Sequence, residues 1–180
     1  QEQAIVCTDF RYTEQAAQQA PGWRIDRIGA KPDWFPNLVN EFGIEVVGFE
    51  ADNMTVESLN RFKATLKEGD VNTHLKPTSG IGLDLRAYKD TEEIELLQKA
   101  IDIGDQAFED TAAQLKSGIT EREAAWMFEQ AVRCRGAESV SFDTIVAAGP
   151  NAARPHHATG DTKLMEGQPI VFDCGARYQG

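Results

Sequence analysis

The stretch that decides the fold is residues 142–180, which read FDTIVAAGPNAARPHHATGDTKLMEGQPIVFDCGARYQG. The apolar run 142–148 predicts one strand, and the apolar run 169–174 predicts a second. Between them, residues 149–163 hold few large apolar side chains and begin with a Gly-Pro-Asn turn, so we expect a loop there. The final residues, 176–180, follow a glycine and predict a hairpin turn after the second strand.

Two capped helices are predicted upstream of this stretch. Asp90 with Glu93, and Thr120 with Glu123, have the spacing of capping boxes, in which side chain and backbone at a helix start exchange hydrogen bonds. We expect the first helix to run to Gly118 and the two helices to form an antiparallel pair. The expected apolar faces are Ile94, Leu97, Ile101, Phe108 and Leu115 on the first helix and Ala124, Met127, Phe128, Ala131 and Val132 on the second.

The first part of the chain alternates between strand-like and helix-like segments. This order is typical of an α/β domain with helices packed on a sheet. Residues 77–82 are rich in Pro, Ser and Gly and predict a loop, and residues 84–90 predict the crossover to a second domain. We expect strands at 4–8, 23–28, 44–49 and 71–76, and helices at 11–20, 33–42 and 55–68.

The sequence therefore predicts two domains, at 1–84 and 85–180. The chain opens with Gln1 rather than a Met, and a strand-like run starts almost at once. We therefore expect the front of the first domain to be missing. The second domain stops at Gly180, where a partner strand is expected, so it is incomplete.

Composition excludes several kinds of partner. The 180 residues carry a net charge of −11, whereas nucleic acids and anionic membranes attract clustered Lys and Arg. No apolar run approaches the length of a membrane-spanning helix. Cys7, Cys134 and Cys174 are widely spaced and predict neither a zinc site nor a disulfide framework. We expect a cytoplasmic protein with reduced thiols that binds neither nucleic acid nor membrane.

Two features of the deciding stretch offer chemistry. Asp173 lies in an apolar run, where an unpaired carboxylate is costly, so it either binds a metal, caps the turn at the strand end or bonds to Arg177. His156 and His157 follow Pro155, and neighbouring side chains on extended backbone point in opposite directions. At most one of them therefore faces a given site. The alternative is an ordinary solvent-exposed loop histidine.

Several short motifs form an unusual set when taken together. The second domain has Gly149-Pro150-Asn151, Pro155-His156, Glu166-Gly167 and Val171-Phe172-Asp173-Cys174-Gly175-Ala176, and the first has Thr8-Asp9-Phe10-Arg11-Tyr12 followed by Glu14-Gln15-Ala16. This set resembles the prolidase and aminopeptidase P family, the pita-bread metallopeptidases with a creatinase-type N-terminal domain. The resemblance spans nearly the whole chain. It implies a creatinase-like α/β domain followed by the first part of an α+β pita-bread domain.

The resemblance also implies roles for individual residues. Asp173 matches the first metal-ligating aspartate of a two-metal centre. His156, 17 residues earlier, matches an active-site histidine that faces the substrate without binding metal, and His157 is then its outward-facing neighbour. The family's other ligands, an Asp, a His and two Glu, fall at positions that this chain does not contain. Such donors suit two divalent ions, manganese first and cobalt or zinc as alternatives, which lower the pKa of a shared water.

The function implied by the resemblance is hydrolysis of Xaa-Pro bonds in proline-containing peptides by an aminopeptidase or dipeptidase that forms homodimers. A single Asp cannot hold two ions, so we expect this chain to be an inactive fragment of such an enzyme. Two alternatives remain: a non-catalytic pita-bread module that binds peptides or proteins, and a metal-free creatinase-like amidinohydrolase. The acidic residue at position 173 argues against both.

Overall fold

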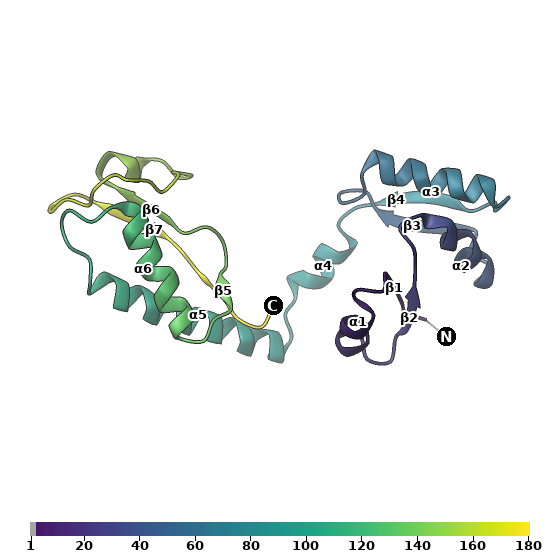
Figure 1. Cartoon of the computed structure of the whole chain (residues 1–180), viewed down its shortest axis with the longest axis horizontal. Helices are drawn as coiled ribbons and strands as arrows, with labels where there is room; N and C mark the ends of the chain where they lie inside the picture. The colour runs from purple at the N-terminus through teal and green to yellow at the C-terminus, as the bar shows by residue number, and fades with distance from the viewer. Residues whose placement is uncertain (1–2) are drawn as a thin grey trace. The chain divides into compact units, whose positions relative to one another are not determined.

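A computed structural model of the chain describes residues 3–180. The chain divides into two compact units, Gln1–Ala87 and Tyr88–Gly180 (Figure 1). Each unit combines helices with short strands. Among the described residues, none of the helices is long and apolar enough to cross a membrane.

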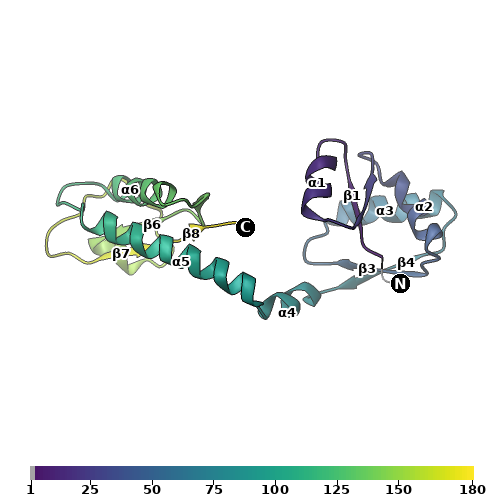
Figure 2. The same cartoon turned by 90° about the horizontal axis from the view of Figure 1, so that it is seen from below.

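The first unit places two pairs of parallel strands against helices. The strands are β1 (Ile5–Thr8) with β2 (Arg24–Arg27), and β3 (Val46–Glu50) with β4 (His74–Thr78). The helices are α1 (Thr13–Gln19), the 3-10 helix η1 (Pro32–Trp34), α2 (Phe35–Glu41), α3 (Val56–Glu68) and α4 (Ile81–Ala87). Each parallel pair is joined through a helical crossover, α1 or α3, as parallel strands require. Helices α2 and α3 lie together over one side of β3 and β4 (Figure 2).

Aromatic rings fill the space between η1, α2 and α3. Phe62 meets Phe35 and Trp34 edge to face, with ring centroids 5.0 and 6.2 Å apart. Val39 of α2 and Leu66 of α3, on the same two helices as Phe35 and Phe62, are almost completely buried. The first unit therefore has the helix-on-sheet architecture expected of an α/β domain.

Two local predictions for the first unit are wrong. Residues expected to form loop and crossover form helix α4 instead, because Gly80 adopts a φ of 74° and its carbonyl accepts the N–H groups of Leu83 and Asp84. Strand β4 begins at His74 rather than at residue 71. Val71 is still part of the turn that ends α3, since its N–H donates to the carbonyl of Leu66 at 3.0 Å.

The second unit packs a helical hairpin against an antiparallel ladder. Helices α5 (Thr91–Ala112) and α6 (Glu121–Cys134) both begin with the capping boxes that the sequence predicts. Strand β6 (Ile145–Ala148) pairs with β7 (Ile170–Asp173), and β5 (Ser139–Val140) pairs with β8 (Ala176–Arg177). The 3-10 helix η2 (Gly149–Ala153) follows β6 directly. This arrangement leads the chain from the ladder into the loop that carries the histidine pair.

Helix α6 supplies the core of the second unit. Phe128 and Val132 are fully buried against Ala107 of α5. One turn earlier on α6, Ala124 packs with Val146 of β6 and with other buried apolar residues. The expected buried face of α6 is therefore confirmed for Ala124, Phe128 and Val132.

Three boundaries in the second unit differ from the prediction. Helix α5 ends at Ala112 rather than Gly118, one residue after Thr111, whose hydroxyl donates to the carbonyl of Ala107. Hydroxyls bonded back to the helix in this way weaken and bend it. The strand predicted to begin at residue 142 starts only at Ile145. The final residues form no hairpin turn after β7, because 176–177 continue the ladder as β8 beside β5.

Candidate functional site

The histidine pair lies in a tight turn of the loop between β6 and β7. The N–H of His157 donates to the carbonyl of Arg154 at 3.2 Å, which closes a four-residue turn with Pro155 in its second position. Proline favours that position because its φ is fixed. His156 is the third residue of the turn and is exposed, whereas only 10% of the His157 side chain is exposed. The expectations of extended backbone here and of an outward-facing His157 are therefore wrong.

Asp173 is the last residue of β7 and lies opposite Ile145 of β6. It is exposed rather than buried, because β7 alternates between half-buried and exposed side chains. Within residues 3–180, no hydrogen bond or ion pair engages its carboxylate, and Arg177 lies 3.6 Å from Glu138 instead. Pairing of Asp173 with Arg177 is therefore wrong, and the carboxylate is available to bind a ligand.

The two expected site residues are not joined in this chain. No hydrogen bond or ion pair links His156 to Asp173 in the described residues. In the same part of the chain, no group of three or more His, Cys, Asp and Glu side chains gathers as metal ligands would. Divalent ions take about four to eight ligands, so the residues present do not fit a metal centre by themselves. A metal at Asp173 needs further ligands from outside this chain.

The structure adds a residue that the sequence analysis did not single out, Glu121 at the first position of α6. After Phe128 it is the largest fully buried side chain in the described residues. Its Oε1 accepts hydrogen bonds from the Ala148 N–H and the Asn151 side-chain amide, both at 2.9 Å. Its Oε2 accepts the Gly160 N–H at 3.0 Å and lies 2.8 Å from the His157 Nε2. Each of the two carboxylate oxygens therefore has two hydrogen-bond partners.

These contacts fix the charge of Glu121. Burial alone would raise its pKa, but the hydrogen bonds from Ala148, Asn151, His157 and Gly160 outweigh burial and lower the pKa to about 2. The carboxylate is therefore ionised at neutral pH and can only accept hydrogen bonds. It follows that the Nε2 of His157 carries a hydrogen, which it donates to Glu121.

A sequence signal for Glu121 exists in the spacing of α6. Glu121, Ala124, Phe128 and Val132 follow one another by three, four and four residues and so share one helix face. All four are buried. An acidic residue at the head of an apolar face is the pattern that predicts a buried, hydrogen-bonded carboxylate.

Further contacts hold the loop on both sides of the histidines. The Thr159 hydroxyl accepts the Val146 N–H at 2.8 Å and donates to the Thr144 carbonyl at 3.0 Å. Beyond it, Lys163 forms an isolated bridge with Thr120, the residue that caps α6. The loop is therefore anchored to β6 and to the start of α6.

Two glycines in the recognised motifs have a steric role. Gly149 adopts a φ of 55°, and a side chain there would run into the amide of Gln168. At Gly175, between β7 and β8, an added Cβ would clash with the Ser141 hydroxyl, which would have to rotate away. These two positions set the start of the loop and the end of the strand that carries Asp173.

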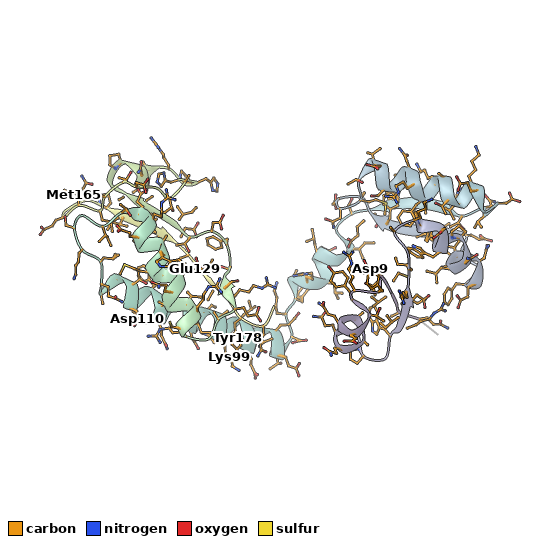
Figure 3. All side chains as sticks on the ribbon, viewed as in Figure 1. Asp9, Lys99, Asp110, Glu129, Met165 and Tyr178 are labelled. Carbon is orange, nitrogen blue, oxygen red and sulfur yellow. The ribbon has the colours of Figure 1, made fainter. Side chains whose placement is uncertain are left out.

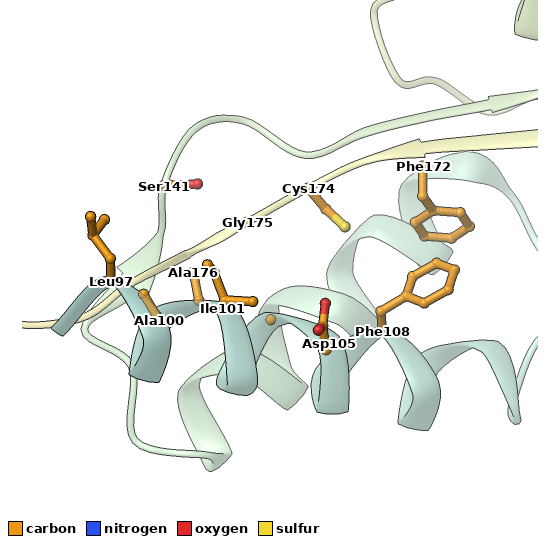
Figure 4. Close-up of a pocket in the computed structure, with 11 residues that line it drawn as sticks. Leu97, Ala100, Ile101, Asp105, Phe108, Ser141, Phe172, Cys174, Gly175 and Ala176 are labelled. Carbon is orange, nitrogen blue, oxygen red and sulfur yellow. The ribbon is translucent and has the colours of Figure 1, made fainter. Parts of the chain in front are cut away.

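A groove of about 470 Å³ runs between α5 and the strands β7 and β8 (Figure 4). The rings of Phe108 and Phe172 meet edge to face in it, with centroids 5.5 Å apart. Burial raises the pKa of the Cys174 thiol, and the charges of Asp173 and Asp105 raise it further. Such a thiol is protonated at neutral pH, which makes it a poor nucleophile.

The end of the described chain lies on α5. The Lys99 ammonium is 5.8 Å from the ring centroid of Tyr178, a cation–π contact (Figure 3). At the opposite end of the ladder, Met165 is half-exposed in the turn that leads into β7 (Figure 3).

Two family models match the chain. The creatinase/prolidase N-terminal domain matches residues 1–88, and metallopeptidase family M24 matches residues 95–180. The two matches fall on the first and second structural units respectively.

Curated relatives and solved structures give the same result. Peptidase YqhT of Bacillus subtilis is 36% identical over 99% of this chain and 50% of its own length. The structure of an Xaa-Pro dipeptidase from Bacillus anthracis superposes with a TM-score of 0.89 and 37% identity, covering 96% of this chain and 47% of that one. For an X-Pro aminopeptidase from Thermotoga maritima the TM-score is 0.87 and the identity 32%, with 99% and 50% covered.

The chain spans about half the length of the curated relatives that it matches along its whole length. Its two units have the fold expected from the sequence, a creatinase-like α/β domain and the start of a pita-bread domain. From both family models and from these relatives, the chain belongs to metallopeptidase family M24, in the group whose members carry a creatinase/prolidase N-terminal domain.

Proposed function

We propose that this chain is the N-terminal half of a metal-dependent exopeptidase that hydrolyses Xaa-Pro bonds, and that the half alone is inactive. The observation that carries the proposal is similarity across both units to proteins named for Xaa-Pro hydrolysis, with TM-scores of 0.89 and 0.87. Proline suits a dedicated enzyme, because its tertiary amide and fixed φ fit poorly into ordinary peptidase sites.

In this proposal Asp173 is one ligand of a two-metal centre whose other ligands follow Gly180. Its exposed carboxylate, free of hydrogen-bond and ion-pair partners among residues 3–180, supports that role. His156 faces the substrate without binding metal. Its exposed position in the third place of a closed turn supports that role, because the turn directs the imidazole away from the core.

The finer features of the enzyme are part of the same proposal. The ions are manganese in the cell, with cobalt or zinc as substitutes, since carboxylate and imidazole donors suit these metals. The protein is a cytoplasmic homodimer that acts on proline-containing peptides. A net charge of −11 on this chain supports the expectation that it binds neither nucleic acid nor anionic membranes.

The test begins with the gene beyond the codon for Gly180. We expect an Asp, a His and two Glu there, and we expect the longer product to cleave Xaa-Pro dipeptides or peptides when loaded with manganese. The 180-residue chain should show no activity. In the longer product, Asp173→Asn should abolish activity and lower the metal content measured by elemental analysis.

The matched control is Asp161→Asn, which removes a carboxylate from the same stretch. Among residues 3–180 that carboxylate pairs with exposed Arg122 alone. It should keep full activity. A longer product that carries all the ligands but cleaves no Xaa-Pro bond would refute the proposed function. Missing downstream ligands would point to a binding module or an amidinohydrolase instead. Gel filtration with light scattering decides whether the product is the proposed dimer.

A further inference from the structure

A fully buried charge at the start of α6 needs a reason beyond helix stability. The helix is already capped by Thr120 and Glu123, so Glu121 is not needed for capping. An apolar residue at position 121 would simply extend the buried face formed by Ala124 and Phe128. Removing a carboxylate from water costs several kcal/mol unless every lone pair is satisfied, so an ionised side chain here requires specific partners.

All four partners of Glu121 belong to one segment of the chain. Ala148 lies where β6 ends, Asn151 lies in η2, His157 closes the turn, and Gly160 lies where the loop leaves it. The carboxylate therefore binds the segment 148–160 at its start, its middle and its end. His156 is one of several exposed residues that this segment carries between those contacts.

The contacts on either side determine where His156 points. Its turn is closed by the hydrogen bond from His157 to Arg154, and the N–H of Arg154 donates in turn to the Asn151 carbonyl at 2.9 Å. The side chains of Asn151 and His157 both end on Glu121. The residues before and after the turn are thus both bound to the Glu121 carboxylate. His156 projects from the turn into solvent.

We propose that Glu121 is a positioning residue, which holds the segment 148–160 in place and so presents His156 to the substrate. This inference rests on the proposed function for the role of His156, but not for the order of the segment. Glu121 itself touches no substrate, because it is fully buried. It acts through His157, which directly follows His156 in the chain and whose imidazole contacts the carboxylate.

The main variant is Glu121→Gln in the full-length product of the gene. Glutamine has the same shape, but it offers one oxygen and one NH₂ group to four donors. Two donors would face the NH₂ group, so the segment should detach.

Hydrogen exchange followed by mass spectrometry should show at least tenfold faster exchange in peptides covering 148–160. A displacement of about 1 Å lowers rates by about 10²-fold, so kcat should fall by that order with little change in KM.

The matched control is Glu123→Gln, on the same helix turn. It removes the same charge, and Gln still completes a capping box. Its kcat should stay within about twofold of the wild type, as for ordinary surface substitutions. Equal exchange of the segment in Glu121→Gln and the wild type would overturn the inference, as would equal losses of kcat in the two variants.

A second pair of variants keeps Glu121 and so avoids leaving its site without a carboxylate. His157→Ala removes one donor, whereas His157→Gln replaces it with an amide N–H. We expect His157→Ala to show fast exchange in the segment and a low kcat, and His157→Gln to recover most of both. Two variants with equal exchange and equal kcat would overturn the inference even if Glu121→Gln failed to fold.

The two proposals fail in distinguishable ways. If the wild-type protein cleaves no Xaa-Pro bond, the proposed function is wrong, while the exchange measurements still show whether Glu121 orders the segment. If the enzyme is active but the segment exchanges equally in all variants, the positioning role is wrong and the proposed function stands.

Discussion

Helices α5 and α6 form one hairpin, yet they are covered to different extents. On α6, the inward face is completely buried from Glu121 to Val132. On α5, the large apolar residues Ile94, Leu97, Ile101 and Phe108 are each at least 40% exposed. Soluble proteins seldom leave such a row of large side chains uncovered.

The difference shows which parts of the fold this chain completes alone. The α6 side is closed within this chain. Glu121 on α6 binds both ends of the loop 148–160, so residues present here hold the loop that carries His156. The α5 side is open, because its apolar residues line the groove beside β7 and β8. Because the chain spans about half the length of its relatives, we expect residues after Gly180 to cover that groove in the proposed longer enzyme.

The largest effect is expected on the closed side. Phe128→Ala removes a fully buried ring from the main cluster of the second unit. Such truncations cost about 3–5 kcal/mol through lost burial and the cavity left behind. Urea unfolding followed by fluorescence should show this loss. A loss below about 1 kcal/mol would mean that the cluster around α6 is not the core.

A loss of similar size is expected on acidification. The pKa of Glu121 is about 2 in the folded chain, against 4.5 for a free carboxyl group, so the unfolded state takes up the proton first. The stability from Glu121 is complete above pH 4.5 and is lost as the pH falls towards 2. At about 1.4 kcal/mol per pKa unit this amounts to about 3.5 kcal/mol.

Urea unfolding of the wild type and of Glu121→Gln between pH 6 and pH 2 measures this contribution. The free energy of unfolding of the wild type should fall more steeply across that window than that of the variant. Parallel curves would contradict the low pKa. The comparison of slopes remains valid even if the variant is less stable at every pH.

The smallest effect is expected on the open side. Phe108→Ala removes a ring that is 40% exposed and has one aromatic partner, Phe172. In the 180-residue chain the loss should be about 1–2 kcal/mol, from partial burial and one ring pair. In the longer enzyme the same change should cost about 3–5 kcal/mol, as for a fully buried ring. Equal losses in the two proteins would mean that the groove stays open.

Where strong local signals exist, the sequence predicted the structure. Both capping boxes are present, because each depends on residues only three positions apart. The two strands on either side of the loop were predicted from apolar runs, and they are β6 and β7; their pairing with each other was not predicted. Helix α4 was missed because its glycines suggest a loop, while the hydrogen bonds to Gly80 that start it cannot be read from composition.

The site was harder to predict than the fold. His156 and Asp173 were chosen from motifs, and their roles stay predictions. The inward turn of His157 depends on Glu121, which lies 36 residues away in the sequence. The exposure of Asp173 depends on which face of β7 meets the helices, and a four-residue apolar strand does not reveal that.

The contact between Glu121 and Gly160 has a consequence for synthesis of the chain. The two residues are 39 positions apart, and ribosomes add about 5–20 residues per second, so the carboxylate emerges roughly 2–8 s before its last donor. During that interval the start of α6 must stay hydrated, because its charge cannot be buried unpaired. We therefore expect the nascent hairpin to remain loose at this end and to tighten only when the histidine turn has left the ribosome.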